Sequence, residues 1–274
     1  MTRFTRLGFV LAILDWSTFL AAAEPPLVTV IQGDLPIVLS APHGGREVVP
    51  EVPIRVGRGT TQFVTVRDDN TAELTDKVAA LLEQRLKRKP FVVLARFERK
   101  FIDVNRPAEH AYESSLAKPH YDAYHAALAE ACRTVLNRWQ RGLLIDVHGQ
   151  TLEDDTIFRG TNNRHSVTRL LERSGEAALS GEHSVCGVLA QRGYAIFPPG
   201  ASRDAEHPRY NGGHIIRTCG SHVAAGLDAI QLEFGTNLRR RSVLDKTAED
   251  TAAAIAEFAQ EYLPTKQAAE GKTD

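Results

Sequence analysis

Three side chains with catalytic potential each lie at the end of a short apolar stretch of this sequence. His43 and His148 each follow such a stretch, and Glu233 lies at the end of a third. Asp146 precedes His148 by two residues, so the two side chains share a face if the stretch is a strand. Neutral imidazoles combined with one carboxylate form catalytic zinc sites, which keep one position open for water. These residues therefore indicate a metal-dependent hydrolytic site.

A second group of polar residues suits substrate binding and proton transfer. Arg106 follows Asn105, and a guanidinium group offers a bidentate match to a substrate carboxylate. Glu233 suits the role of a carboxylate that does not bind the metal. Such a group can take a proton from the attacking water and pass it to a leaving amine.

The elements that must position these residues are strands alternating with helices. The sequence predicts strands or extended stretches at 27–31, 37–41, 60–67, 91–95, 143–148, 194–197 and 228–234. It predicts helices around 74–86, 124–139, 184–191 and 247–262, the second with a glycine stop at Gly142. Alternation of this kind predicts an α/β fold with a mostly parallel or mixed central sheet and helices on both faces. Ligands bind such sheets at the carboxyl ends of the strands.

Composition limits the partners and the compartment. The chain has 274 residues, 43% of them hydrophobic, which suits one large domain. A net charge of −1 gives no electrostatic reason to expect nucleic acid or an anionic membrane as a partner. Residues 1–23 have basic residues, an apolar run and an Ala-rich end, and so predict a signal peptide ahead of a single domain at 24–274.

Export to the periplasm or the extracellular space follows from this leader, with no stable membrane partner once it is cleaved. An uncleaved N-terminal anchor is the competing interpretation, although the apolar run is short for a spanning helix. The three cysteines, Cys132, Cys186 and Cys219, show no C-x-x-C spacing. One disulfide with a leftover thiol and three ordinary buried thiols both remain open.

Five short motifs, in order, resemble the N-formylglutamate amidohydrolase family over residues 37–262. They are Pro42-His43-Gly44-Gly45, Asp68-x-x-Thr71, Arg99-x-x-x-Asp103-x-Asn105-Arg106, Asp146-x-His148-Gly149 and Gln231-x-Glu233. The resemblance implies a hydrolase with one zinc ion and a fold similar to zinc carboxypeptidases and bacterial cell-wall amidases. Taken singly, each motif is also compatible with an ordinary turn, loop or strand end.

The resemblance also implies a role for each matched residue. His43 and His148 would be zinc ligands. Asp103 would accept a hydrogen bond from the ring nitrogen of His43 that does not bind the metal. Glu233 would be the general base and acid. The expected substrate-binding residues are Arg99, Asn105 and Arg106.

The third metal ligand is the least determined by the sequence. Carboxypeptidases use His-x-x-Glu, but Arg46 occupies that position here and Glu47 lies one residue further on. The amidases take their acidic ligand from the start of the following helix, where this chain has Asp68. Asp68 is therefore preferred over Glu47, although a plain helix cap would also explain it.

The resulting prediction is an exported zinc amidohydrolase that cleaves the amide bond of an N-acyl amino acid similar to N-formylglutamate. Its expected partner is a small carboxylate-bearing substrate. A peptidoglycan amidase or carboxypeptidase-like metallopeptidase is the first alternative, and an inactive exported binding module is the second. Outside the motifs, His214 is the histidine expected nearest the pocket, and the arginines at 239–241 are expected to be an exposed face.

Overall fold

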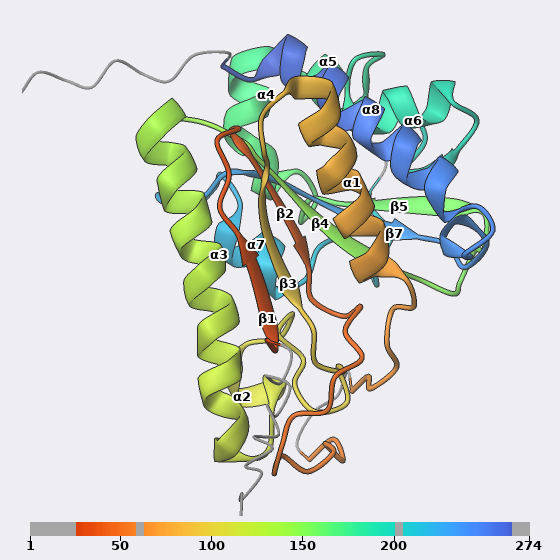
Figure 1. Ribbon diagram of the computed structural model, residues 1–274. Helices are drawn as coiled ribbons and strands as arrows, with labels where there is room; N and C mark the ends of the chain where they lie inside the picture. Colours follow the sequence, from red (N-terminus) through yellow and green to blue (C-terminus); the bar gives the residue numbers. More distant parts are fainter. Residues whose placement is uncertain (1–25, 59–62, 201–204, 265–274) are drawn as a thin grey trace, which may run out of the picture.

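A seven-stranded sheet forms the centre of the protein in its computed structural model, which describes residues 26–58, 63–200 and 205–264 (Figure 1). The strand order is β1-β3-β2-β4-β7-β5-β6. The strands are β1 (Val28–Ile31), β2 (Ile37–Ala41), β3 (Phe91–Ala95), β4 (Leu143–Gly149), β5 (Thr156–Gly160), β6 (Ala195–Phe197) and β7 (Asp228–Phe234). The predicted leader at 1–23 lies outside the described residues.

The sheet is mixed, with a parallel centre. Strands β3, β2, β4 and β7 run parallel, whereas β1 is antiparallel to β3 and β5 is antiparallel to β7. The parallel strands therefore end at one edge of the sheet. The register places Ser40 beside Asp146, and His148 beside Glu233. The predicted fold class is confirmed.

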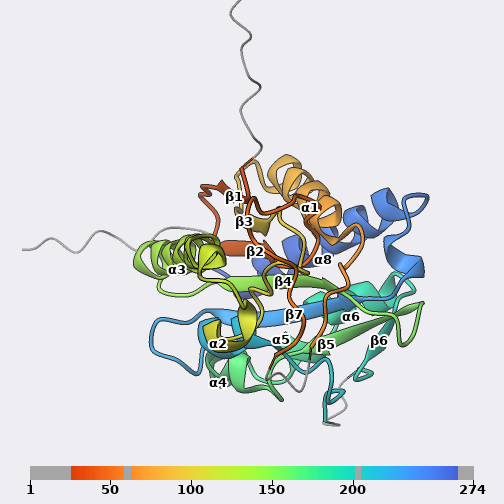
Figure 2. The same ribbon diagram turned by 90° about the horizontal axis from the view of Figure 1, so that it is seen from below.

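Helices cover both faces of this sheet (Figures 1 and 2). Helices α1 (Thr71–Leu86), α6 (Val185–Gln191) and α8 (Leu244–Tyr262) pack on one apolar cluster. Helices α3 (Lys118–Trp139) and α7 (His214–Cys219) pack on the other. Side chains along a strand alternate between faces, so Ile37 and Leu39 join the first cluster and Val38 joins the second. The strands are therefore buried on both faces.

Several predicted boundaries are wrong. Helix α3 ends at Trp139, with Gln140 in the left-handed conformation, rather than at Gly142. Residues 63–67 form no strand, and 60–62 lie outside the described residues. The sequence did not indicate β5 or α7, or the short helices α2 (Ala108–Ala111), α4 (Thr168–Ser174) and α5 (Ala177–Ser180). Single-turn 3-10 helices lie at Ser115–Ala117, His165–Val167 and Asn237–Arg239.

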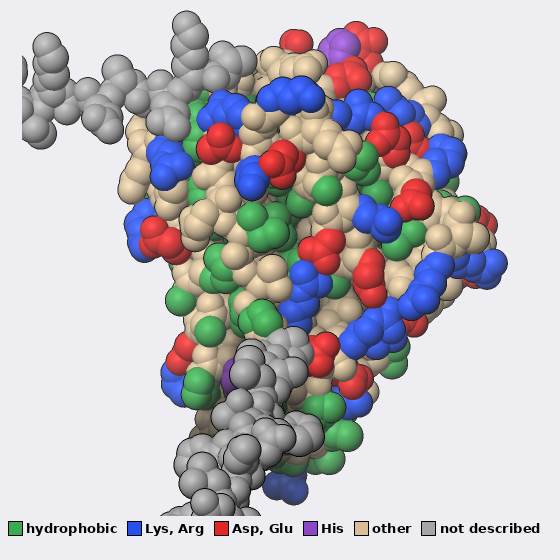
Figure 3. Space-filling model, viewed as in Figure 1, with side chains coloured by type: hydrophobic (Ala, Val, Ile, Leu, Met, Phe, Trp, Pro, Cys, Tyr) green, Lys and Arg blue, Asp and Glu red, His purple; other side chains and the backbone are tan. Residues whose placement is uncertain are grey.

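The surface shown in Figure 3 mixes charges of both signs, with basic and acidic side chains interspersed between apolar ones. This pattern agrees with the net charge of −1. In the part of the chain that the structure describes, no helix is long and apolar enough to cross a membrane.

Candidate metal centre

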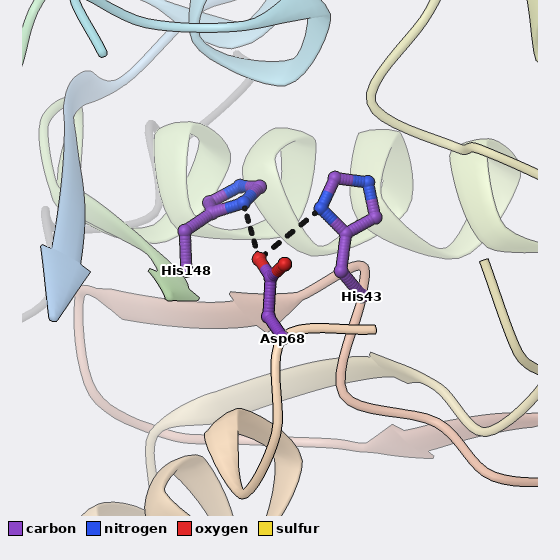
Figure 4. A group of neighbouring side chains, drawn as sticks. All are labelled: His43, Asp68 and His148. Carbon is purple, nitrogen blue, oxygen red and sulfur yellow. Dashed lines mark ion pairs between the residues drawn. The ribbon is translucent and has the colours of Figure 1, made fainter. Parts of the chain in front are cut away.

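His43, Asp68 and His148 converge at the carboxyl edge of the parallel strands (Figure 4). Asp68 Oδ2 lies 3.4 Å from His43 Nδ1 and 3.3 Å from His148 Nδ1. All three residues are at most 7% exposed. Within the described residues, this is the group of His, Cys, Asp and Glu side chains able to hold a metal ion. The structure thus brings together Asp68, rather than Glu47, with the two histidines.

Three separate segments of chain supply these ligand atoms. His148 lies within β4, His43 follows the end of β2, and Asp68 precedes the first turn of α1. Gly44 allows the segment after β2 to press against α1, because a Cβ at Gly44 would lie 2.3 Å from the backbone nitrogen of Ala72. The Asp68 backbone N–H donates to the His43 carbonyl over 3.1 Å, which fixes the two segments side by side.

Carboxylates behind the two imidazoles determine which ring nitrogen faces the centre. His43 Nε2 lies 2.7 Å from Asp103 Oδ1, as the resemblance implies, and His148 Nε2 lies 2.9 Å from Asp146 Oδ2. Ser40 donates to the other oxygen of Asp146 over 2.6 Å. With the protons held on Nε2, each Nδ1 has a free lone pair directed toward Asp68.

The donor set fits a divalent metal ion. His43 Nδ1 is buried and has no hydrogen-bond partner among the described residues. The three ligand atoms lie within 4.8 Å of one another. Two imidazole nitrogens and one carboxylate oxygen form one of the protein ligand sets found in catalytic zinc sites.

The pKa values of the clustered side chains are shifted because these groups lie so close together. Burial alone would raise the pKa of Asp68, but the close contacts with His148 and His43 outweigh it and hold that pKa below its ordinary value. Burial opposes the charged form of His148, yet Asp146 and Asp68 raise its pKa well above 6.5. Asp103 is likewise buried, and Arg99 with His43 lowers its pKa well below the usual range. These groups form a tightly coupled set of charges.

Glu233 lies next to this centre in a different environment. It is 7% exposed and is adjacent to His148 across the β4–β7 pair. Burial raises its pKa to about 8, and the negative charge of Asp68 adds to that increase against the opposing effect of His148. Gln231 Nε2 donates to Glu233 Oε1 over 2.8 Å, and the Gly213 backbone N–H donates to Gln231 Oε1 over 2.9 Å. Glu233 is therefore a buried and oriented carboxyl group.

The three predicted substrate-binding residues have different surroundings. Arg99 places Nε and Nη2 on Asp103, and its Nη1 lies 3.7 Å from Asp68 Oδ1. Asn105 is buried, with its oxygen accepting from the Ile215 backbone N–H and its Nδ2 lying 3.2 Å from His148 Nε2. Arg106 is half-buried and forms no ion pair with any described residue, so its guanidinium is available to an anion.

Arg239 is not part of an exposed face, contrary to the expectation from the sequence. Arg239 is 5% exposed, and its guanidinium donates to the carbonyls of Phe234, Asp69 and Gln150 over 2.9–3.1 Å. It therefore ties the ends of β7 and β4 to the segment that carries Asp68. Arg240 and Arg241 are exposed, as predicted. Three consecutive arginines gave no sign that one of them was buried.

Gly149 is the last residue of the Asp146-x-His148-Gly149 motif. Its backbone also contacts the candidate metal centre. Its N–H donates to Asp68 Oδ2 over 3.1 Å. A Cβ at this position would lie 2.5 Å from Arg239 Nε. Glycine is therefore required for β4, Arg239 and Asp68 to approach one another this closely.

Comparison with protein-family models gave no match for the sequence, and neither did comparison with curated proteins. Comparison of the structure with solved structures did find similar folds. A crystal structure of N-formylglutamate amidohydrolase from Ralstonia eutropha is 17% identical, with a TM-score of 0.59 over 86% of this chain and 97% of that one. A gene product of Agrobacterium tumefaciens is 15% identical, with a TM-score of 0.53 over 87% and 97% of the two chains. At the level of the fold, the resemblance seen in the sequence is confirmed: this chain is folded like an N-formylglutamate amidohydrolase.

Proposed function

We propose that the protein is a zinc-dependent hydrolase that cleaves the amide bond of a carboxylate-bearing N-acyl amino acid. N-formyl-L-glutamate is the first candidate substrate, because the similar structure from Ralstonia eutropha is named for its hydrolysis. The observation that carries the proposal is the convergence of His43 Nδ1, His148 Nδ1 and Asp68 Oδ2 beside the buried Glu233. We also propose that residues 1–23 export the enzyme.

His43, Asp68 and His148 would hold the metal ion, and the carboxylates behind the imidazoles would keep each ring in the ligating orientation. A zinc ion supplies a Lewis acid that polarises an amide carbonyl and lowers the pKa of a water molecule toward about 7. Burial of all three ligands keeps bulk water away from the site.

Glu233 would carry the proton during hydrolysis. Its carboxylate takes a proton from the attacking water, and the resulting acid gives that proton to the nitrogen of the leaving amine. A pKa raised by burial suits both halves of this transfer, because the group can hold the proton until the carbon–nitrogen bond breaks. The Gln231 amide holds one carboxyl oxygen in place, so the other oxygen is available to the water.

Arg106 would bind the substrate carboxylate. Its guanidinium pairs with no described acidic residue, and its Nη1 bond to the Asn105 carbonyl fixes it beside the site. Asn105 would contribute its amide hydrogens from beside His148. Arg99 would contribute Nη1 to the carbonyl oxygen, since its other nitrogens bind Asp103.

The test combines metal analysis with hydrolysis of N-formyl-L-glutamate by wild type and Glu233→Gln. We expect about one zinc ion in both proteins and a loss of turnover of about 10²-fold or more in the variant. Glu130→Gln is the matched control, because Glu130 is exposed on α3. Absence of tightly bound metal would overturn the metal site. Metal with full activity in Glu233→Gln would overturn the role of Glu233.

A further inference from the structure

Four aromatic rings pack together outside the two large apolar clusters of the sheet. Phe158 of β5 is 1% exposed, and its ring centroid lies 5.5 Å from that of Phe197, 5.2 Å from that of His207 and 5.0 Å from that of Tyr210. The rings of His207 and Tyr210 stack on each other at 5.1 Å. Phe158 is buried, yet it belongs to neither large cluster of the described residues. These four residues are called the aromatic cluster below.

The strand register places the aromatic cluster beside the candidate catalytic carboxyl. Strands β4, β7, β5 and β6 lie in this order (Figure 2), and one row across them joins His148, Glu233, Phe158 and Phe197. Directly opposite residues project from the same face of a sheet, with Cβ atoms about 5 Å apart. Ile157 projects from the other face, into the cluster that α1 covers. Phe158 and Glu233 are therefore neighbours on the face that carries the metal centre.

Two of the four rings come from the segment 205–213, which is fastened by polar contacts near both ends. Glu206 is 4% exposed, and its carboxylate accepts from the Thr161 backbone N–H over 2.8 Å and from the Thr161 hydroxyl over 2.5 Å. At the other end, the Gly213 backbone N–H donates to Gln231 over 2.9 Å. Because these contacts hold the segment, its two aromatic rings have a fixed position.

Tyr210 also lies within electrostatic reach of the metal centre. Burial raises the pKa of its phenol, and Arg209 opposes that increase. The negative charges of Glu233 and Asp68 add to the increase. This agrees with the position of the Tyr210 ring on Phe158, the neighbour of Glu233 in the strand register.

The residue assigned to the substrate carboxylate lies on the other side of the metal centre. The Tyr121 hydroxyl, on α3, donates to the Arg106 carbonyl over 3.0 Å, and α3 packs on β1, β2 and β3. The aromatic cluster lies at the opposite end of the strand order, on β5 and β6. A substrate with its carboxylate on Arg106 and its carbonyl at the metal centre would therefore direct its acyl group toward the aromatic cluster.

We infer that the aromatic cluster binds the acyl group and that the enzyme prefers N-acyl amino acids whose acyl group is aromatic. This inference rests on the proposed function and specifies its substrate class. A formyl group ends in one hydrogen atom and has no apolar surface to place on these rings. A benzoyl group adds a phenyl ring, and aromatic rings pack edge-to-face or offset at centroid distances of about 4.5–7 Å. The apolar area buried by such a ring raises affinity roughly 10- to 100-fold.

The test compares kcat/KM of the metal-loaded enzyme for N-formyl-, N-acetyl- and N-benzoyl-L-glutamate, which share the same leaving amine. We expect the value for the benzoyl substrate to exceed the other two by about 10-fold or more. Tyr210→Ala should remove most of this preference, whereas Tyr210→Phe keeps the ring and should retain the preference. Arg209→Ala is the matched control, because it changes an exposed residue of the same segment, and it should also retain the preference.

A binding measurement separates this inference from the proposed function. Calorimetry with Glu233→Gln should give a Kd for N-benzoyl-L-glutamate about 10-fold or more below that for N-acetyl-L-glutamate. This measurement also provides the test if Tyr210→Ala fails to fold. Equal kcat/KM and equal Kd values for these substrates would overturn the role of the aromatic cluster and leave the hydrolase intact. Preferential binding of the benzoyl compound without its hydrolysis by wild type would support the aromatic cluster and overturn the proposed function.

Discussion

At the scale of single residues, the site depends on which nitrogen each imidazole presents. Asp103 and Asp146 occupy the two Nε2 atoms, so only the Nδ1 atoms face Asp68. We expect His148→Ala to lose its metal during gel filtration, because two of three ligands hold the ion too weakly. The measurement is metal content per protein, with the exposed His110→Ala as control. Full occupancy in His148→Ala would show that the ligand set is wrong.

In the proposed site, Asp146 would act on a bound metal ion through His148 rather than by contact. Replacing it with Asn keeps the shape but removes the charge that holds the Nε2 proton, so we expect zinc affinity to fall by about 10- to 100-fold. Competition with a chelator measures this change. Ser40→Ala, which removes only the bond to Asp146 Oδ1, should have a smaller effect. Equal affinities in Asp146→Asn and wild type would remove Asp146 from the site.

Arg106 is assigned to the substrate carboxylate because its guanidinium has no acidic partner among the described residues. Arg106→Ala should lower kcat/KM for N-formyl-L-glutamate by about 10- to 100-fold, mainly through KM, since a charge-assisted hydrogen bond contributes about 1.5–3 kcal/mol. The same variant should act on an uncharged N-formyl amide as the wild type does. A similar loss on both substrates would contradict the assignment.

At the scale of elements, Arg239 joins the ends of β4 and β7 to the segment before α1. Arg239→Met removes one donor from each of three carbonyls, two of them in buried contacts, so we expect unfolding to require about 2–4 kcal/mol less and metal affinity to fall. Urea denaturation and chelator competition measure the two effects. The neighbouring Arg240→Met changes an exposed side chain and should match wild type. Indistinguishable behaviour of the two variants would refute the structural role of Arg239.

The elements predicted correctly from the sequence are those in which apolar residues recur at a regular spacing. Leu74, Val78 and Leu82 recur at helical spacing and are all fully buried in α1. Strand β5 gave no such signal, because its pairing with β7 is set by tertiary contacts rather than by its own pattern. The three candidate ligands lie together because each is at or next to the boundary of a recognisable element. The contacts of Arg239 could not be predicted, since they join three distant backbone segments.

At the scale of the whole molecule, His125 makes stability depend on pH. Burial and the nearby His214 lower the pKa of His125 to about 4, against weaker opposing effects of Asp122 and Asp146. Between pH 6.5 and 4 the unfolded chain binds a proton that the folded chain does not, so stability falls as pH falls. Above pH 6.5 His125 does not reduce the stability of the fold. Near pH 4 the free energy of unfolding is lower by about 2–3 kcal/mol because of this group.

Urea denaturation at several pH values, with wild type and His125→Asn compared, isolates this effect. The acid-induced loss should be smaller in the variant by about the stated amount. Other groups also titrate in this range. The effect of His125 is therefore the difference between wild type and variant in the free energy of unfolding lost on acidification. An identical loss in both proteins would contradict a neutral, partly buried His125.

The origin of the ligands in three distant chain segments also determines when the ion can bind during folding. Asp68 and His148 are separated by α1, β3, α2 and α3, and His43 lies 25 positions before Asp68, so the unfolded chain offers no local chelating pair. In zinc fingers the metal drives folding, because its ligands lie close together along a short chain. Here the parallel strands must pair before the three ligands meet. Capture of the ion would therefore be a late event, and the refolding rate should not depend on the zinc concentration.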